Sequence, residues 1–265
     1  MPSSSRCAVI TGAASGIGRA ISYALAKRNI NLVLADIDED GLRQSAAHIA
    51  KAAPSVRISI LKTDLSRAEQ ITALSEHAFA AFGQVDWLYN CAGTLVSGRS
   101  WELDEAQWAK VLDINLWAAI RTARAFVPRF IEQGSGHIVN IASLAGLLVG
   151  PWLAPYTVSK HGMVALSETM QQEFSALKLP LKISIVCPGP VNTGICRDIV
   201  PAQDDPQVAG SNDFLRNMIS AGMHPDELAD IVLAGVDADK FWIYPHAAIL
   251  KPALRQRMET LLAVE

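Results

Sequence analysis

Short apolar runs alternate with longer amphipathic stretches along this chain. The short runs predict buried β-strands at 7–11, 31–36, 57–62, 86–91, 136–143, 182–188 and 240–245. The longer stretches predict helices at 17–28, 39–52, 66–82, 104–133, 156–178 and 225–236. Because apolar strands alternate with helices, we expect a doubly wound α/β fold: a parallel sheet of about seven strands with helices on both faces.

One segment breaks this alternation. Residues 189–224 show no clear hydrophobic period and contain several prolines and glycines. An irregular segment of this length inside an α/β domain is typically a lid, a binding loop or disordered. We therefore expect a substrate loop at about 189–224.

Composition limits the classes of partner. The chain has 265 residues, 50% of them hydrophobic, with a net charge of −3 and a pI near 6.1. This balance predicts neither a nucleic-acid partner nor a membrane partner. The apolar stretch 141–156 is interrupted by Gly and Pro and is too short to span a bilayer. The mean hydropathy of +0.21 favours burial of part of the surface in an oligomer.

The metal-binding residue types show no ligand pattern. The four cysteines have no CxxC or other metal spacing, and the six histidines are scattered over different elements. We expect no metal and four reduced thiols, three of them in strand-like runs. Reduced thiols, and an N-terminus without a signal-peptide h-region, predict a cytoplasmic protein.

A glycine-rich turn follows the first strand. Residues 11–18 read TGAASGIG and run into a helix, which makes an anion site suited to a pyrophosphate. A plain strand-to-helix turn is the alternative, because such turns are common. Asp36 ends the second strand, where a carboxylate accepts hydrogen bonds from an adenosine ribose and repels a 2′-phosphate. That favours NAD over NADP, although a turn or helix-cap aspartate is also consistent. Asp64 lies near the adenine or caps the helix that follows it.

Polar residues of types suited to catalysis follow the next strands. The run NCAG closes the fourth strand, and Ser143 ends the fifth, at the sheet edge where α/β proteins bind ligands. Asn115 lies inside a predicted helix, where an Asn is unfavourable unless its side chain has a partner. Tyr156 and Lys160, in YTVSK, stand one helical turn apart. A surface pair at that spacing is common, so the pair alone proves nothing.

Taken together, TGAASGIG, NCAG, Asn115, Ser143, YTVSK and the run PGPVNT at 188–193 resemble the classical short-chain dehydrogenase/reductase family. The resemblance covers about residues 7–245. It implies a single Rossmann-type dinucleotide-binding and catalytic domain over 1–265, an NAD cofactor, and a homodimer or homotetramer assembled through the helices 104–133 and 156–178. It differs from the family in one detail: the common double Asn is Asn90-Cys91 here.

The resemblance also assigns residues. The catalytic set it implies is Asn115, Ser143, Tyr156 and Lys160. The cofactor-binding set is Gly12, Ser15, Gly16, Ile17, Gly18, Asp36, Asp64, Leu65, Asn90, Ala92, Gly93, Tyr156, Lys160, Pro188, Gly189, Val191 and Thr193. The substrate set is Ser143, Leu144, Ala145, Trp152, Tyr156, Pro190 and Ile195.

These assignments predict a mechanism. A free tyrosine has a pKa of about 10. We expect the Lys160 ammonium and the positive nicotinamide of the oxidised cofactor to lower it, so that Tyr156 serves as general acid/base between a secondary alcohol and a ketone. Ser143 is expected to hydrogen-bond the substrate oxygen. Further apolar candidates for the substrate wall are Thr94, Leu95, Val96, Leu147, Ile199, Phe214 and Met218. They predict a substrate with a hydrophobic body.

Two other function classes stay open at this point. The same fold supports non-catalytic NAD(P)-binding regulators. A structural or interaction protein needs neither a cofactor nor the four residues of the catalytic set. The complete set of Asn115, Ser143, Tyr156 and Lys160 argues against a non-catalytic regulator. The glycine turn with Asp36 argues against a structural or interaction protein.

Overall fold

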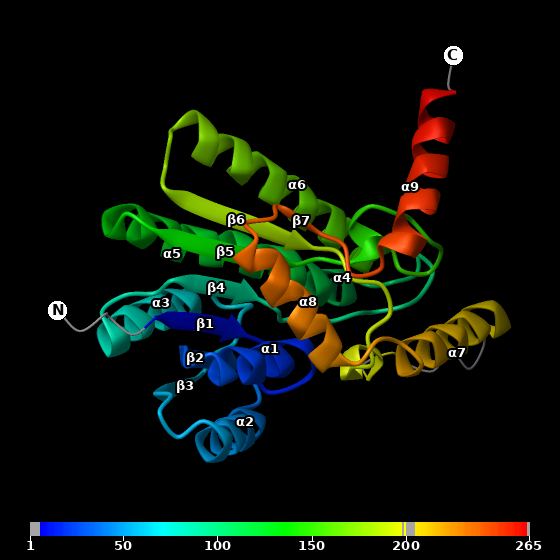
Figure 1. The fold of residues 1–265 in the computed structure, drawn as a ribbon. Coiled ribbons are helices and arrows are strands. Elements are labelled where there is room, and N and C mark those ends of the chain that lie inside the picture. Colours follow the sequence, from blue (N-terminus) through cyan, green and yellow to red (C-terminus); the bar gives the residue numbers. More distant parts are fainter. Residues whose placement is uncertain (1–5, 198, 200–204, 264–265) are drawn as a thin grey trace.

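The described residues form a seven-stranded parallel sheet in the computed structural model, which describes residues 6–197, 199 and 205–263. The strands are β1 (Cys7–Thr11), β2 (Asn31–Asp36), β3 (Ile58–Lys62), β4 (Trp87–Asn90), β5 (Gly136–Ile141), β6 (Leu181–Val186) and β7 (Trp242–Ile243). Their order across the sheet is β3-β2-β1-β4-β5-β6-β7 (Figure 1). The chain therefore starts in the middle of the sheet, builds one side and then crosses over to build the other. The predicted doubly wound fold is confirmed.

Helices cover both faces of this sheet. In chain order they are α1 (Gly16–Lys27), α2 (Glu39–Ala52), α3 (Ala68–Phe82), α4 (Glu105–Leu112), α5 (Ala118–Gln133), α6 (Ala154–Ala176), α7 (Pro206–Ser220), α8 (Pro225–Asp237) and α9 (Ala247–Leu262). Figure 1 shows α1, α2 and α8 on one face, with α3, α5 and α6 on the other. Each crossover between parallel strands thus brings a helix back over the sheet.

Alternate side chains of each central strand enter separate cores. In β1, Ala8 and Ile10 pack with α1, α2 and α8, whereas Cys7 and Val9 pack on the opposite face. On that opposite face Phe79, Phe126 and Phe130 form an aromatic group with ring centres 6.0–6.3 Å apart. Since both faces of the strand are buried, the strand reads as a continuous apolar run, which is the pattern that predicted it.

The predicted helix at 104–133 is interrupted. Residues Asp113–Trp117 form one π-helical turn between α4 and α5. Gly162 of α6 lies against this turn, because a Cβ on Gly162 would lie only 2.8 Å from Leu116 Cδ2. Single π turns inside α-helices often occur at functional positions, and this one carries Asn115.

The prediction of an irregular loop throughout 189–224 is wrong for Pro206–Ser220, which form α7. The Asp205 side chain accepts hydrogen bonds from the N–H groups of Gln207 and Val208 and so caps the helix, with Pro206 at its first turn. Both are ordinary start signals of a helix. They were overlooked because only Val208, Asn212 and Leu215 of α7 are buried, which gives a weak apolar period.

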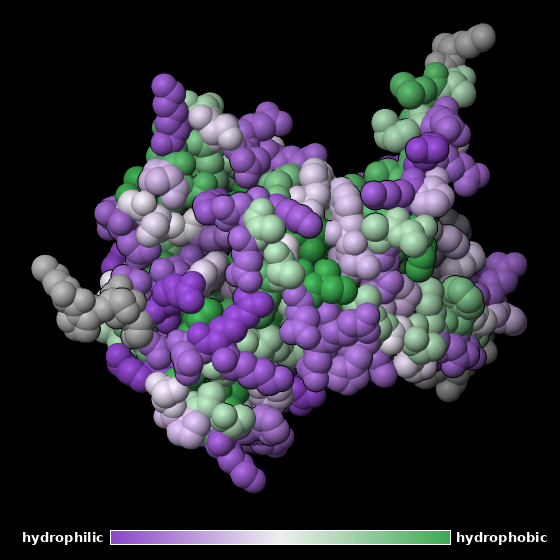
Figure 2. All heavy atoms as spheres, viewed as in Figure 1, coloured by the Kyte–Doolittle hydropathy of each residue, from purple (hydrophilic) through white to green (hydrophobic). Residues whose placement is uncertain are grey.

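Helix α9 extends away from the sheet toward the C-terminus (Figure 1). Leu250 is fully buried at its base, but Ile249, Met258, Leu261 and Leu262 are exposed. Figure 2 shows apolar side chains along this projecting helix. Among the helices of the described ranges, none combines the length and apolarity needed to cross a bilayer.

Candidate active site

The glycine-rich turn joins β1 to α1 at the carboxyl edge of the sheet. Gly12 and Gly16 have φ values of +68° and +53°, which favour glycine. A Cβ on Gly12 would lie 2.8 Å from the backbone of Ala92, so the turn packs directly on the residues that follow β4. The Thr11 hydroxyl accepts a hydrogen bond from Cys91 N–H at 3.1 Å and joins the same two segments.

Asp36 is bound to this turn. One carboxylate oxygen accepts a hydrogen bond from Ala14 N–H at 3.0 Å, and the other accepts from Asp38 N–H at 3.0 Å. The helix cap is Asp38, whose side chain accepts from Gly41 N–H. Asp36 is therefore not the cap of α2. It keeps a half-buried carboxylate beside the glycine turn, while its role toward a ribose stays a prediction.

Asp64 and Leu65, two predicted cofactor residues, follow β3. The Asp64 side chain accepts hydrogen bonds from the N–H and the hydroxyl of Ser66, so it organises the start of α3. Leu65 is buried against Ile71 and Ala118. Asp64 is not the cap of α3, because the N-cap is Arg67 and has no side-chain capping hydrogen bond.

Asn90 belongs to a buried polar network behind the sheet edge. Its side-chain N–H donates to Asn140 Oδ1 at 2.8 Å, and its Oδ1 accepts from the Thr122 hydroxyl at 3.1 Å. Asn140 in turn donates to the Ser167 hydroxyl at 2.9 Å. The sequence analysis missed Asn140, Thr122 and Ser167. Their signal was a polar residue inside an apolar strand or helix face, which requires a buried partner.

Asn115 is fully buried and fully engaged. Its Oδ1 accepts from Thr94 N–H at 2.9 Å, and its Nδ2 donates to Thr94 O at 2.9 Å and to Ser159 Oγ at 3.0 Å. Ser159 donates to Tyr156 O at 2.7 Å. The expected burial of Asn115 is confirmed. Its side chain connects the segment after β4 to the turn of α6 that carries Tyr156 and Lys160.

Ser143, Tyr156 and Lys160 converge at the ends of β5 and α6. Lys160 Nζ donates to Ile141 O at 2.9 Å and lies 5.6 Å from the centre of the Tyr156 ring. The Ser143 hydroxyl accepts from Ala145 N–H at 3.1 Å and also hydrogen-bonds Tyr156. The two side chains of YTVSK therefore lie on one side of the site, as their spacing predicts.

Burial governs the titration of this pair. It raises the pKa of Tyr156 above its ordinary value, and the hydrogen bond with Ser143 partly opposes this. Burial also lowers the pKa of Lys160 to about 8. The expected lowering of the Tyr156 pKa includes the positive charge of the oxidised cofactor, and in the protein alone burial of the phenol instead raises this pKa.

The segment after β6 closes the site from the other side. Leu144 N–H donates to Pro188 O at 2.8 Å, and Thr193 packs on the glycine turn, since a Cβ on Gly16 would lie 3.3 Å from Thr193 Cγ2. Gly189 N–H donates to His246 Nδ1 at 3.0 Å. The sequence analysis assigned His246 no role, and nothing in its local pattern indicates this long-range contact.

An apolar cluster surrounds Tyr156. Leu95, Ile199 and Leu215 are its buried members, and Leu153, Ile195, Cys196 and Ile219 pack against them together with Tyr156. Leu95, Ile195 and Ile199 were predicted for the substrate wall. Phe214 and Met218 were also predicted, but they are 68% and 37% exposed. Leu215 and Ile219, one position later, face the cluster instead, because the helical turn of α7 directs its 208, 212, 215 and 219 positions inward.

Other predicted wall residues take different positions. Leu147 packs with Ala142 and Met163 in a separate cluster under β5 and β6. Trp152 has φ +66° and accepts a hydrogen bond from Gly98 N–H at 2.9 Å through its carbonyl. Leu144 and Ala145 form the short helical turn directly after Ser143.

None of the four cysteines is activated as a thiolate. Burial raises the pKa of Cys7 and of Cys187 to about 12 and also raises that of Cys91 and Cys196. These thiols are protonated at neutral pH and are therefore poor nucleophiles.

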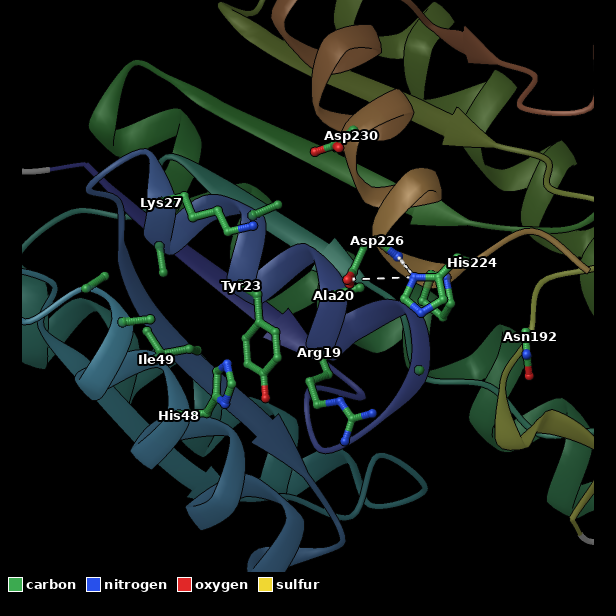
Figure 3. A pocket seen from close by; sticks show the side chains of 16 residues that line it. Arg19, Ala20, Tyr23, Lys27, His48, Ile49, Asn192, His224, Asp226 and Asp230 are labelled. Carbon is green, nitrogen blue, oxygen red and sulfur yellow. Dashed lines mark hydrogen bonds and ion pairs between the residues drawn. The ribbon is translucent and has the colours of Figure 1, made fainter.

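A pocket of about 580 Å³ lies elsewhere, between α1, α2 and α8 (Figure 3). Tyr23 and His48 stack in it with ring centres 4.7 Å apart. Arg19 and Lys27 line it together with Asp226 and Asp230, and it reaches the glycine turn only at Gly16. Its lining includes neither Ser143 nor Tyr156, so this pocket is separate from the catalytic geometry.

Known proteins share this arrangement. The short chain dehydrogenase family matches residues 6–204. The chain belongs to the short chain dehydrogenase family. The 1-deoxy-11-beta-hydroxypentalenate dehydrogenase of Streptomyces avermitilis is 34% identical, over 91% of this chain and 84% of that protein.

Solved structures agree. A short chain dehydrogenase/reductase from Burkholderia phymatum in complex with NAD has a TM-score of 0.91 and 32% identity, over 97% of this chain and 94% of that one. A short-chain dehydrogenase from Sphingobium yanoikuyae in complex with NADPH has a TM-score of 0.79 and 27% identity, over 98% and 96%. This short chain dehydrogenase is thus an oxidoreductase that acts on CH–OH groups and takes a nicotinamide cofactor. The alternatives of a non-catalytic regulator or an interaction protein are not supported.

The residues present fit such a cofactor. The Ser15 side chain makes no capping hydrogen bond at the start of α1. The backbone N–H groups at this helix start therefore remain the donors for a cofactor phosphate. Gly93 is exposed, and a Cβ there would lie 3.8 Å from Lys160 Nζ and 3.4 Å from Asn115 Oδ1. The missing side chain keeps access to Lys160 open.

Proposed function

We propose that this short chain dehydrogenase interconverts a secondary alcohol and a ketone with NAD, on a substrate with a hydrophobic body. The observation that carries the proposal is the convergence of Ser143, Tyr156 and Lys160 at the carboxyl edge of the sheet, with Lys160 Nζ 5.6 Å from the Tyr156 ring. An ordinary surface Tyr–Lys pair is exposed, whereas Lys160 is only 4% exposed.

In the proposed mechanism Tyr156 is the general acid/base. Its oxygen accepts the hydroxyl proton of an alcohol or returns a proton to a ketone. Ser143 donates a hydrogen bond to the substrate oxygen, where negative charge develops. When bound, the nicotinamide cofactor supplies the hydride acceptor or donor, and its oxidised ring adds positive charge. That charge and Lys160 both favour the phenolate, against the effect of burial on the pKa of Tyr156.

Asn115 and Lys160 have supporting roles in this mechanism. Asn115 holds Thr94 and Ser159, and through Ser159 the α6 turn of Tyr156. Lys160 presents its ammonium group to the cofactor ribose and to the phenol. Residues after β6, among them Pro188, Gly189, Val191 and Thr193, complete the cofactor site.

The proposed preference for NAD rests on Asp36. Its carboxylate ends β2 beside the glycine turn, where it attracts ribose hydroxyls and repels a 2′-phosphate. The Burkholderia structure with NAD supports this choice, and the Sphingobium structure with NADPH makes a direct comparison of both cofactors necessary.

The proposed hydrophobic substrate rests on the cluster around Tyr156. Leu95, Leu153, Ile195 and Leu215 offer apolar contacts to the body of an alcohol. The similarity to a hydroxypentalenate dehydrogenase supports a carbocyclic alcohol as one such substrate.

The test follows NADH formation by absorbance with a panel of secondary alcohols. Tyr156→Phe is expected to lower kcat/KM by about 10²- to 10⁴-fold, because general acid/base catalysis contributes that much. Tyr23→Phe removes a hydroxyl from α1, far from Ser143, and is the matched control. Equal rates in wild type and Tyr156→Phe would refute the mechanism.

We further propose a cytoplasmic homodimer or homotetramer formed by one catalytic domain per chain. Trp117, at the π turn, is 47% exposed, and the apolar side chains of α9 are also uncovered. Exposed apolar groups on helices favour burial between subunits. The unpaired thiols are consistent with a reducing compartment.

A further inference from the structure

One buried amide of this molecule has no partner. Asn212, on α7, is 1% exposed, and neither its Nδ2 nor its Oδ1 makes a hydrogen bond. Leaving one buried polar group unsatisfied is destabilising, and Asn212 has two such atoms. Buried polar groups in folded proteins are nearly always paired, so an orphan amide needs an explanation.

The position of Asn212 indicates what the amide is for. It lies on the inward face of α7, one helical turn after Val208 and one turn before Leu215. Leu215 and Ile219 of the same face pack in the cluster that contains Tyr156. The orphan amide therefore lies on the same face of α7 as two residues that pack in the cluster around Tyr156.

A second orphan group lies on the facing segment. The Ser97 hydroxyl is buried and also makes no hydrogen bond. It follows Leu95 by two residues, and Leu95 packs in the same cluster as Leu215. Arg99 ties this segment to the start of α7 through an ion pair with Asp205 at 2.8 Å.

We infer that Asn212 recognises a second hydrogen-bonding group of the substrate, remote from the reacting carbon. This inference rests on the proposed function. A primary amide offers both a donor and an acceptor, so it matches a group that can accept and donate, such as a hydroxyl or a carboxamide. The substrate class is then a hydrophobic alcohol or ketone with a second, uncharged polar function.

The charges near α7 favour an uncharged group. Arg99 pairs with Glu102 and Asp205, and Arg216 pairs with Asp213. These cations already have carboxylate partners. A substrate carboxylate would accept from Nδ2 but leave Oδ1 unpaired and facing a like partial charge.

The experiment compares alcohols that differ by one polar group. Cyclohexanol and the cyclohexanediol with its hydroxyls on opposite ring carbons are one such pair, and apolar alcohols with and without a remote hydroxyl or carboxamide extend the panel. We expect wild-type kcat/KM to favour at least one bifunctional member over its partner by about tenfold or more, because a site built to bond a polar group rejects the analogue that lacks it.

Asn212→Leu and Asn212→Ala are expected to abolish that ratio. Asn212→Leu is also expected to raise the Tm of the protein without substrate by about 2–4 °C, because it removes buried unpaired polar atoms. Asn217→Leu makes the same change on the exposed side of α7, and we expect it to leave the ratio unaltered.

Each result decides the matter. An unaltered ratio in both Asn212 variants, or a wild type without preference for any bifunctional member, would overturn the inference and leave the proposed function intact. A lower Tm in Asn212→Leu with an unaltered ratio would identify a structural water as the partner of the amide. Absence of turnover for every alcohol would overturn the proposed function, and this inference with it.

Discussion

Two buried asparagines, Asn115 and Asn212, differ in their hydrogen bonds. Asn115, in the π turn, makes three hydrogen bonds to Thr94 and Ser159, and it supports the end of the site that carries the chemistry. Asn212, on α7, makes none. The difference teaches that the Asn115 side is organised by hydrogen bonds within the protein, whereas the α7 side keeps a buried amide unpaired, which our inference assigns to a substrate group.

The largest loss of stability is expected from a substitution in the glycine turn. Gly12→Ala is expected to destabilise the protein by more than about 3 kcal/mol, because a Cβ would meet the Ala92 backbone at 2.8 Å in a residue with φ +68°. Chemical denaturation measures the loss. Gly134→Ala is the control, since it has a positive φ of +76° but nothing within 4 Å of its Cβ. A similar loss in both variants would show that the backbone conformation alone is responsible.

Replacement by Leu at Asn115 and at Asn212 is expected to change the free energy of unfolding in opposite directions. Asn115→Leu removes the two hydrogen bonds to Thr94 and the one to Ser159, and it should lower the free energy of unfolding by about 2–4 kcal/mol. Asn212→Leu should raise it. Urea unfolding of both variants checks this. Destabilisation by both would remove the distinction between the two sides.

Lys160→Met tests the energetic cost of the buried ammonium. Burial lowers the pKa of Lys160 to about 8 from 10.5, so the folded protein releases this proton at lower pH than the unfolded chain. The wild type therefore gains stability relative to the Met variant as the pH rises from about 8 to about 10.5.

Below pH 8 the charged lysine carries the full penalty, and Lys160→Met is expected to be more stable than wild type by about 1–3 kcal/mol. The extra stability of Lys160→Met should decline as the pH rises from about 8 to about 10.5. Unfolding curves of both proteins at several pH values measure it. A difference that does not vary with pH would contradict the buried-ammonium account.

The smallest expected effect concerns the cofactor. Asp36→Ala should reduce the preference for NAD over NADP by about tenfold, because it removes the negative charge that opposes a 2′-phosphate. The ratio of kcat/KM with the two cofactors measures it. Asp38→Ala removes the cap of α2 instead and should leave that ratio unaltered. A wild type that prefers NADPH would refute our interpretation of Asp36.

Local pattern predicted most of the fold and the chemical residues. Strands buried on both faces are continuous apolar runs, so all seven predicted strands lie within two residues of the observed bounds, although β7 keeps only Trp242 and Ile243 of 240–245. The spacing of Tyr156 and Lys160 implied one helix face, which α6 provides. These features depend on neighbours along the chain.

Features that depend on distant partners were missed or wrong. The inward face of α7 is Leu215 and Ile219 rather than Phe214 and Met218, because its phase is determined by packing against Leu95. The raised pKa of Tyr156 in the protein without cofactor was also missed. It depends on how much water the fold removes from the phenol, which no spacing of residues reveals.

The sequence by itself determined the order of the seven strands, the glycine turn and the spacing that brings Tyr156 and Lys160 to one helix face, since each depends on residues close together in the chain. Tertiary structure alone decided which buried polar groups find partners. A hydrogen bond between Asn115 and Thr94, or the lack of one at Asn212, depends on angstrom-scale distances between segments that meet only when the sheet is assembled.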